Sequence, residues 1–288
     1  MIHKSETITD YLEANFDLNR IKTLPITDKF RLINYIKLVS SASVIAKNYD
    51  LEAIQNSEFY NMDCTFQLLI SLLTSGVPAD VLSDVIESYC RNFENSDIYY
   101  AKLLMLGAGT LMIQHGVDRD SIISYLIILL GDDFLRNNFT RIYAEKDTLN
   151  ITDENMIDIK YKTYDYTYRE MKYDMLAILK ARHEFGYDKA KEIIFEHYGN
   201  KNLKFHFTLL DLKDKFVSDY IYNKLMVDSP KMDRFLMTAS RCILSEMSVL
   251  ETHYLLNAII GKYTEFDQPY EEVMKDVHAR ELEILKAI

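Results

Sequence analysis

One group of histidines and glutamates has the residue types that most often bind metal ions. His183 and His197 lie close together in the chain, with Glu184, Glu192 and Glu196 beside them. A di-iron bundle needs a Glu-x-x-His pair on each of two helices, and a zinc protease helix needs His-Glu-x-x-His. Neither spacing occurs, so the sequence predicts no metal and no cofactor. We interpret these histidines as surface or partly buried side chains.

Two adjacent aspartates, Asp132 and Asp133, follow an apolar stretch, as in the magnesium-binding motif of helical terpenoid synthases. That motif needs a further acid, because Mg²⁺ takes several oxygen ligands, whereas the run here is DDFLRNN. Acids near the start of a helix are favoured by its dipole. We therefore expect both aspartates to begin a helix rather than to hold a metal.

The remaining motifs for catalysis are incomplete. Gly107 and Gly109 form a G-x-G, but no strand is expected before them and the third glycine of a dinucleotide fingerprint is missing. We interpret both glycines as sites of close helix packing. No nucleophile elbow, phosphate-binding loop or kinase motif set occurs. The sequence thus predicts no catalytic residue, although a nucleophile and its base can lie far apart in a chain.

The composition favours helices. The chain has 288 residues, of which 48% are apolar, but only 8 glycines and 4 prolines. Sandwiches, barrels and nucleotide-binding folds use glycine and proline at their turns, so we expect an all-α fold. The net charge of −11 argues against nucleic acid and anionic membrane surfaces as partners.

Cysteine usage and the apolar runs predict a soluble, cytoplasmic protein. Cys64, Cys90 and Cys242 match no zinc spacing, and their odd number does not suggest a disulfide framework. We expect buried thiols in a reducing compartment. The first residues lack the apolar core of a signal peptide. The longest apolar run, 125–130, is far shorter than the ~20 residues of a membrane span.

Residues 66–134 contain two similar helix–turn–helix units. Each has an apolar helix, Gly-Val, two variable positions and a second apolar helix; Gly76 and Gly116 mark an offset of 40 residues. This offset is typical of helical repeats. We expect HEAT- or armadillo-like helix pairs, or else an irregular multi-helix bundle. Gly186, in the segment 184–199, is interpreted as the same kind of turn.

Helices are expected along most of the rest of the chain. The helix at 121–130 is apolar on most sides and is predicted to be central. A polar stretch at 147–160 is the best boundary, giving an N-terminal lobe 1–148 and a C-terminal lobe 149–288. The other predicted helices begin at a cap, a proline or an apolar run; they span 9–16, 28–47 (capped by Thr27 or Asp28), 51–54, 203–226, 230–247 (capped by Ser229), 250–260 and 269–285.

A tyrosine-rich stretch follows the boundary, and two periods compete in it. Tyr164, Tyr166 and Tyr168 alternate as in a strand, whereas Tyr161, Tyr164, Tyr168 and Met171 recur at the spacing of a helix. The helical pattern is longer, so we favour a helix. One short strand or hairpin over 155–168, at the junction of the lobes, is the alternative.

Residues 42–90 resemble the cytoplasmic helices of MotA-type flagellar stator subunits. The resemblance lies in AKNYDLEAIQNS and in FQLLISLLTSGVPADVLSDVIES, an apolar helix, a glycine turn and a final helix. That family spans the membrane several times, and no spanning segment is expected here, so no stator residue role is transferred. The resemblance implies a motor-associated or scaffold protein.

We expect a non-catalytic scaffold or interaction protein, associated with a flagellar motor or another large assembly, whose acidic faces favour a basic protein partner; a homo-oligomer is also open. Tyrosine is common at interfaces. The expected contact surfaces are the tyrosine-rich stretch and the last, highly charged helix, with Tyr161, Tyr164, Tyr166, Tyr168, Glu271, Glu272 and Arg280. The alternative is a helical enzyme or small-molecule-binding protein with an apolar, tyrosine-lined pocket between the lobes.

Overall fold

The computed structural model describes residues 8–93, 95–145, 166–261 and 270–286. These residues form helices joined by short turns and contain no strand, which confirms the all-α prediction. Within them, no helix is long and apolar enough to cross a membrane. The chain divides into two compact units, unit 1 (1–160) and unit 2 (161–288). The predicted boundary at 148/149 lies outside the described residues and stays a prediction.

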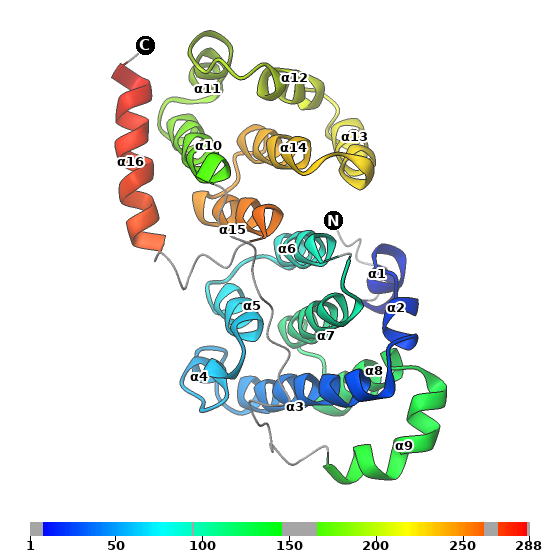
Figure 1. The fold of residues 1–288 in the computed structure, drawn as a ribbon. Coiled ribbons are helices and arrows are strands. Elements are labelled where there is room, and N and C mark those ends of the chain that lie inside the picture. Colours follow the sequence, from blue (N-terminus) through cyan, green and yellow to red (C-terminus); the bar gives the residue numbers. More distant parts are fainter. Residues whose placement is uncertain (1–7, 94, 146–165, 262–269, 287–288) are drawn as a thin grey trace. The chain divides into compact units, whose positions relative to one another are not determined.

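Unit 1 is a bundle built around one buried helix (Figure 1). Its helices, in chain order, are α1 (Ile8–Asn15), α2 (Asn19–Lys22), α3 (Ile26–Asn48), α4 (Glu52–Gln55), the 3₁₀ turn η1 (Tyr60–Met62), α5 (Cys64–Thr74), α6 (Ala79–Asn92), α7 (Asp97–Gln114), α8 (Arg119–Leu129) and α9 (Asp132–Glu145). The bundle therefore corresponds to the second of the two expected architectures.

The central helix of unit 1 is α7, because α3, α5, α6 and α8 all pack against it. From Tyr100 to Ile113 every residue is buried. The prediction that the helix now labelled α8 would be central is wrong, since Ile128 on that helix is exposed. Gly107 and Gly109 explain the difference: their missing side chains let α6 and α3 approach α7 closely, as the packing interpretation of these glycines requires.

Three helices begin directly after a proline. Pro25, Pro78 and Pro230 are the N-cap residues of α3, α6 and α14, with ψ values of 147°, 151° and 153°. The predicted caps Thr27, Asp28 and Ser229 are therefore wrong by one to three positions. Proline fixes its own φ near −65° and favours extended backbone before the helix begins.

The two predicted glycine turns are confirmed and have the same hydrogen bonds. Gly76 and Gly116 have φ of 73° and 70°. The N–H of Val77 donates to the carbonyl of Leu72, five residues back, at 3.2 Å. The equivalent bond from Val117 is 3.0 Å long. This is the Schellman motif, in which a left-handed residue satisfies the last carbonyls of a helix.

A third copy of this turn lies at Glu246, where the sequence offers no glycine. Glu246 has φ of 55°, and the N–H of Met247 donates to the carbonyl of Cys242 at 3.0 Å. The interpretation of Gly186 as the same turn is wrong. Gly186 has φ of 87° with ψ of −180°, a conformation that is essentially restricted to glycine and differs from the left-handed helical one.

Replacing Glu246 by glycine is expected to raise the free energy of unfolding by about 0.5–1 kcal/mol. A left-handed backbone costs an L-residue about 1–2 kcal/mol, and the greater freedom of glycine in the unfolded chain offsets about 0.4–1 kcal/mol of that gain. The exposed ion pair of Glu246 with Arg182, 3.8 Å long, adds little. Urea unfolding followed by circular dichroism measures the change.

The matched contrast is Gly116→Val, which introduces the strain that Glu246→Gly removes. A Cβ at Gly116 would meet nothing within 4 Å, so the expected loss of about 1 kcal/mol or more comes from the backbone alone. Equal stabilities of Glu246→Gly and the native chain would contradict the strain at Glu246.

Unit 2 places α14 between its neighbours α10, α12, α13 and α15 (Figure 1). Its helices are α10 (Tyr166–Phe185), α11 (Tyr187–Glu192), the π-helical turn η3 (Ile193–His197), α12 (Lys201–Leu210), α13 (Lys215–Asp228), α14 (Lys231–Leu244), α15 (Val249–Ile260) and α16 (Tyr270–Lys286). The single helix predicted for 203–226 is wrong. It divides into α12 and α13 because the Asp214 carboxylate accepts from the N–H groups of Phe216 and Val217 and starts a new helix.

The last helix, α16, packs along α10 by one narrow face. Val273 and Val277 are fully buried there, whereas Leu282 is exposed. From Tyr166 onward the tyrosine-rich stretch is helical, as the favoured pattern predicted. The rest of the competing strand segment, 155–165, lies outside the described residues.

Candidate functional site

The largest gathering of exposed apolar side chains lies on α12, α13 and the turn between them. The described residues include fourteen exposed large apolar side chains, and seven of these fall within 205–227. Contiguous exposed apolar surface on a protein commonly marks a binding site. The seven residues are Phe205, Leu212, Phe216, Val217, Tyr220, Leu225 and Val227.

Packing against one side of α13 determines which of its residues remain exposed. Tyr222 and Met226 are buried against Leu210 and Met237. The Tyr222 hydroxyl also lies 2.9 Å from the Thr238 hydroxyl of α14. Both anchors are on the same side of α13, so this side of the helix packs onto the rest of unit 2.

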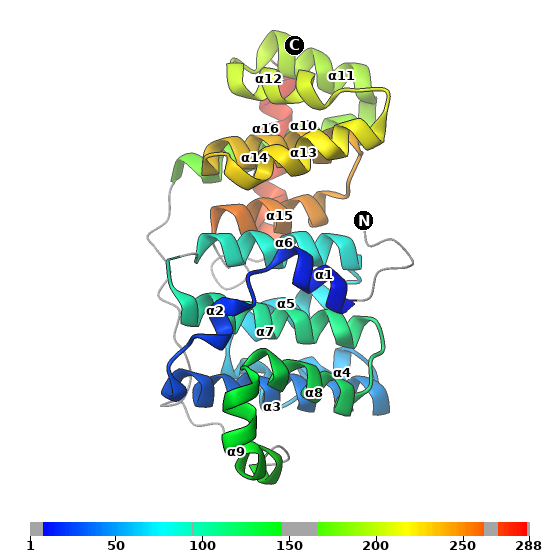
Figure 2. The same ribbon diagram turned by 90° about the vertical axis from the view of Figure 1, so that its right-hand side faces the viewer.

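A different side of α13 carries Phe216, Tyr220, Asn223 and Val227, which we call the α13 face. Phe216 is 79% exposed, Tyr220 58% and Val227 62%. These positions follow the 4-3-4 spacing of a helix seam. In Figure 1 α13 lies at the edge of unit 2, beside α14, and in Figure 2 it faces the viewer. The sequence pattern predicts a single helix over 203–226 and therefore does not indicate the α13 face. The signal that separates α12 from α13 is the capping residue Asp214.

The residues predicted as contact surfaces lie apart from the α13 face. Tyr161 and Tyr164 are outside the described residues, and Tyr166 begins α10. Tyr168 packs into the core of unit 2, with its ring centroid 5.5 Å from that of Phe235. Its contact with a partner stays a prediction.

Three further predicted residues lie on α16. Glu271 and Glu272 are exposed in its first turn. The guanidinium of Arg280 is already hydrogen-bonded within unit 2, because it donates to Asp174 at 2.5 Å and to Glu283 at 2.7 Å. The hydrogen bond to Asp174 is the main reason that the pKa of Arg280 is raised. Of these three residues, only Glu271 and Glu272 therefore present a charge to solvent that is not paired within α16 or α10 in the described residues.

A small pocket of about 220 Å³ lies between η3 and α16, next to Arg280. The hydroxyl of Tyr198 donates to the same Asp174 carboxylate at 2.9 Å, and burial raises the pKa of this tyrosine. The polar groups around the pocket thus bind mainly each other. The alternative function, a small-molecule-binding protein, stays a prediction. The pocket is lined by Ile193, His197, Tyr198, Arg280, Glu283 and Ile284.

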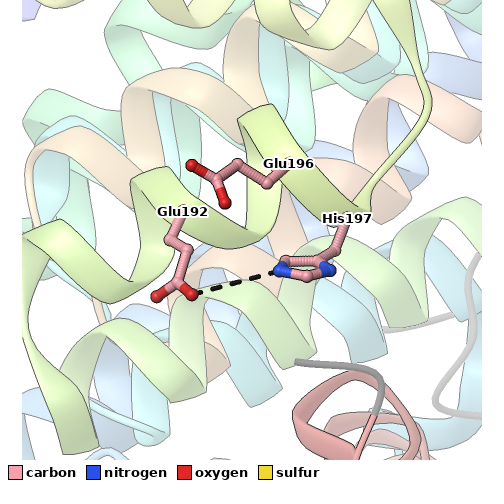
Figure 3. A group of neighbouring side chains, drawn as sticks. All are labelled: Glu192, Glu196 and His197. Atoms are coloured by element: carbon pink, nitrogen blue, oxygen red, sulfur yellow. Dashed lines mark ion pairs between the residues drawn. The ribbon is translucent and has the colours of Figure 1, made fainter.

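Glu192, Glu196 and His197 form one group of potential metal ligands among the described residues (Figure 3). Their ligand atoms lie within 4.8 Å of one another, and His197 Nε2 is 4.0 Å from Glu192 Oε1. The π-helical turn brings residues five apart to one side, which an α-helix would not do. Zinc ligands about 2.1 Å from the metal lie only about 3.4 Å apart in a tetrahedron. The group is wider than that and mostly exposed, so we assign no metal to it.

A buried polar network in unit 2 joins α10 to α15. Lys172 Nζ donates to Asn257 Oδ1 at 3.1 Å, and the Asn257 amide lies 2.9 Å from His253 Nε2. Lys172 and His253 are each 1% exposed, so a substrate has no access to them. Burial, and then the charge of Lys172, lower the pKa of His253 well below its usual 6.5. We interpret the network as structural.

Acidification is expected to destabilise unit 2 through His253. The native imidazole stays neutral, whereas the unfolded chain binds a proton below pH ~6.5, so the unfolded state binds more protons. Stability is therefore complete above that pH and falls by up to about 1.4 kcal/mol per pH unit below it. His253→Gln, which keeps an acceptor for Asn257, is expected to flatten this slope between pH 6.5 and 5 in urea unfolding.

The control for this experiment is His183→Gln, because His183 is exposed at the end of α10. This variant should keep the slope of the native chain. A slope that His253→Gln leaves unchanged would contradict the assignment to His253.

The free thiols agree with the cysteine interpretation only in part. Cys90 and Cys242 are buried, whereas Cys64 is half-buried. Burial raises the pKa of both Cys90 and Cys64, which favours the unreactive thiol form.

Comparisons of the chain with protein-family models, with curated proteins and with solved structures found no match.

Proposed function

We propose that this chain is a non-catalytic protein–protein interaction protein and that the α13 face is its main binding surface. The observation that carries the proposal is that seven of the fourteen exposed large apolar side chains of the described residues fall within 205–227, with Phe216, Tyr220 and Val227 on the α13 face itself. Such side chains gain free energy when a partner removes them from water. Aromatic residues such as Phe216 and Tyr220 contribute strongly at interfaces because they bury a large area with few rotatable bonds.

A second contact is proposed at the start of α16, where Glu271 and Glu272 are exposed. Two adjacent carboxylates favour a basic surface on the partner through electrostatic steering. Truncation of α16 is a poor test of this contact, because Val273 and Val277 belong to the core. The sharper test is charge reversal, Glu271→Lys with Glu272→Lys.

The setting of this activity is also part of the proposal. Free cysteines support a reducing compartment such as the cytoplasm. The resemblance of residues 42–90 to stator helices supports association with a flagellar motor or another large assembly. Within that segment, α5 and α6 form a helix pair joined at Gly76.

The test is cross-linking of the full chain in its native cells, followed by mass spectrometry of the captured proteins. Phe216→Ser with Tyr220→Ser is expected to lose the partners that the native chain captures. The matched control is Ile26→Ser with Tyr49→Ser, which removes two exposed apolar side chains from unit 1 and should keep them. Circular dichroism shows that each variant is folded. Identical capture by both variants would overturn the α13 face as the binding surface.

A further inference from the structure

We infer that the α13 face binds the α13 face of a second copy of this chain, with the two helices parallel and related by a twofold axis. The inference rests on the proposed function and names the partner of the same surface. Three features of the face support it: the spacing of its side chains, the placement of its charges and the low net charge of the surrounding segment.

The spacing is that of a coiled-coil seam. With Tyr220 and Val227 at a positions, Phe216 and Asn223 fall at d positions, and all four are exposed. In a parallel twofold pair, each of these side chains meets its own copy. An Asn223 amide has both donors and an acceptor, so two facing copies can satisfy each other. Three apolar layers and one amide layer then form a self-complementary seam.

The charges beside the seam distinguish the parallel orientation from the antiparallel one. Asp219 occupies the g position and Lys224 the following e position, and parallel helices bring g of one chain to e of the other. Because of the twofold symmetry, the ion pair between Asp219 of one copy and Lys224 of the other forms twice. In an antiparallel pair the same positions would face Val217 and Met226 instead, and no opposite charges would meet.

The geometry of Asp219 and Lys224 suits this role. Asp219 lies 3.5 Å from Arg241 of α14 through Oδ1, yet its side chain keeps 47% exposure. Lys224 is exposed, with its ammonium 5.9 Å from the Tyr220 ring centroid. Both groups are therefore positioned at the rim of the α13 face, where ion pairs set orientation more than affinity.

The local charge favours a second copy over a basic partner. Residues 201–228 contain five lysines, four aspartates and no glutamate, so this segment carries +1, whereas the other 260 residues carry −12. Like-charged surfaces repel, and two copies of this acidic chain can meet at least cost at a segment whose net charge is only +1. The seam covers only two heptads, so we expect a weak, concentration-dependent dimer.

Sedimentation velocity of the full chain over about a hundredfold range of concentration measures this dimer. Lys224→Glu, which sets Asp219 opposite a like charge, is expected to raise the dissociation constant about tenfold. Adding Asp219→Lys to Lys224→Glu reverses both charges of the ion pair. This double variant should have a dissociation constant within about threefold of that of the native chain. The matched control, Lys215→Glu, makes the same charge change at an exposed position outside the seam and should leave the dimer intact.

Disulfide cross-linking tests the orientation. Val227→Cys is expected to link to its own copy under mild oxidation, because parallel helices place equivalent a positions within disulfide reach. An antiparallel pair would separate the two Val227 positions by about 16 Å along the helices. The native chain and Lys215→Cys, treated in the same way, give the background from Cys64, Cys90 and Cys242.

A chain that stays monomeric at all concentrations would overturn the second copy as the partner. So would a dimer that Lys224→Glu and Lys215→Glu weaken equally, or one that Val227→Cys does not link. The proposed function has its own test, the capture experiment: it is overturned if the Phe216→Ser, Tyr220→Ser variant captures the same partners as its control. A monomer that binds neutral phosphatidylcholine vesicles through Phe216 would overturn both.

Discussion

Replacing Lys102 by methionine is expected to lower the free energy of unfolding by about 3–5 kcal/mol. Lys102 lies on the central helix α7, and its ammonium is 2.5 Å from the Asp63 carboxylate. The side chains are 1% and 5% exposed. Methionine fills a similar volume but leaves a buried carboxylate without its counter-charge, and an uncompensated buried charge is very costly.

A second variant separates this charge effect from a loss of packing. Asp63 is also the N-cap of α5, where it accepts from the N–H groups of Thr65 and Phe66. Asp63→Asn keeps an oxygen for the cap and removes the charge. The double variant Asp63→Asn with Lys102→Met is therefore expected to recover most of the stability lost by Lys102→Met alone, since a buried pair can often be replaced by neutral residues.

Urea unfolding followed by circular dichroism gives the size of the effect, and hydrogen exchange of peptides from α5 and α7 assigns it to unit 1. The control is Arg136→Met, which removes the exposed i,i+4 ion pair with Asp132 and should change stability by less than about 0.5 kcal/mol. If Arg136→Met and Lys102→Met lowered the free energy of unfolding equally, the buried ion pair of Asp63 and Lys102 would contribute no more to stability than an exposed one.

Gly109→Ala is expected to destabilise unit 1 by about 1–3 kcal/mol, although alanine is the better helix former. A Cβ at this position would lie 2.4 Å from Cγ1 and 2.7 Å from Cγ2 of Val39 on α3. Valine has a stiff χ1 because it is branched at Cβ, so it cannot turn away cheaply. The helices α3 and α7 must instead move apart within a close-packed core.

A compensating change tests this account. Val39→Ala removes both methyl groups that the new Cβ would meet, so Gly109→Ala should cost less in a Val39→Ala background than in the native chain. Gly199→Ala is the control, because a Cβ there would meet nothing within 4 Å; it should leave stability within about 1 kcal/mol of the native value. Additive effects of Gly109→Ala and Val39→Ala would rule out the contact.

The turns show how far local sequence signals reach. Gly76 and Gly116 end their helices as predicted, since glycine adopts the left-handed conformation at little cost. The same turn at Glu246 could not be predicted in this way, because its residue type gives no such signal. There the packing of α14 against α15 holds a strained backbone in place.

Apolar periodicity and helix-ending residues act over a few neighbours in the chain, so the all-α class, most of the helices and the two glycine turns can be predicted from sequence. The central position of α7, the packing of Tyr168 into a core and the exposure of the α13 face follow from tertiary packing instead. A helix with apolar residues on two sides can bury either one. Which side it buries depends on the neighbours that the fold supplies, as Tyr222 and Met226 show on α13.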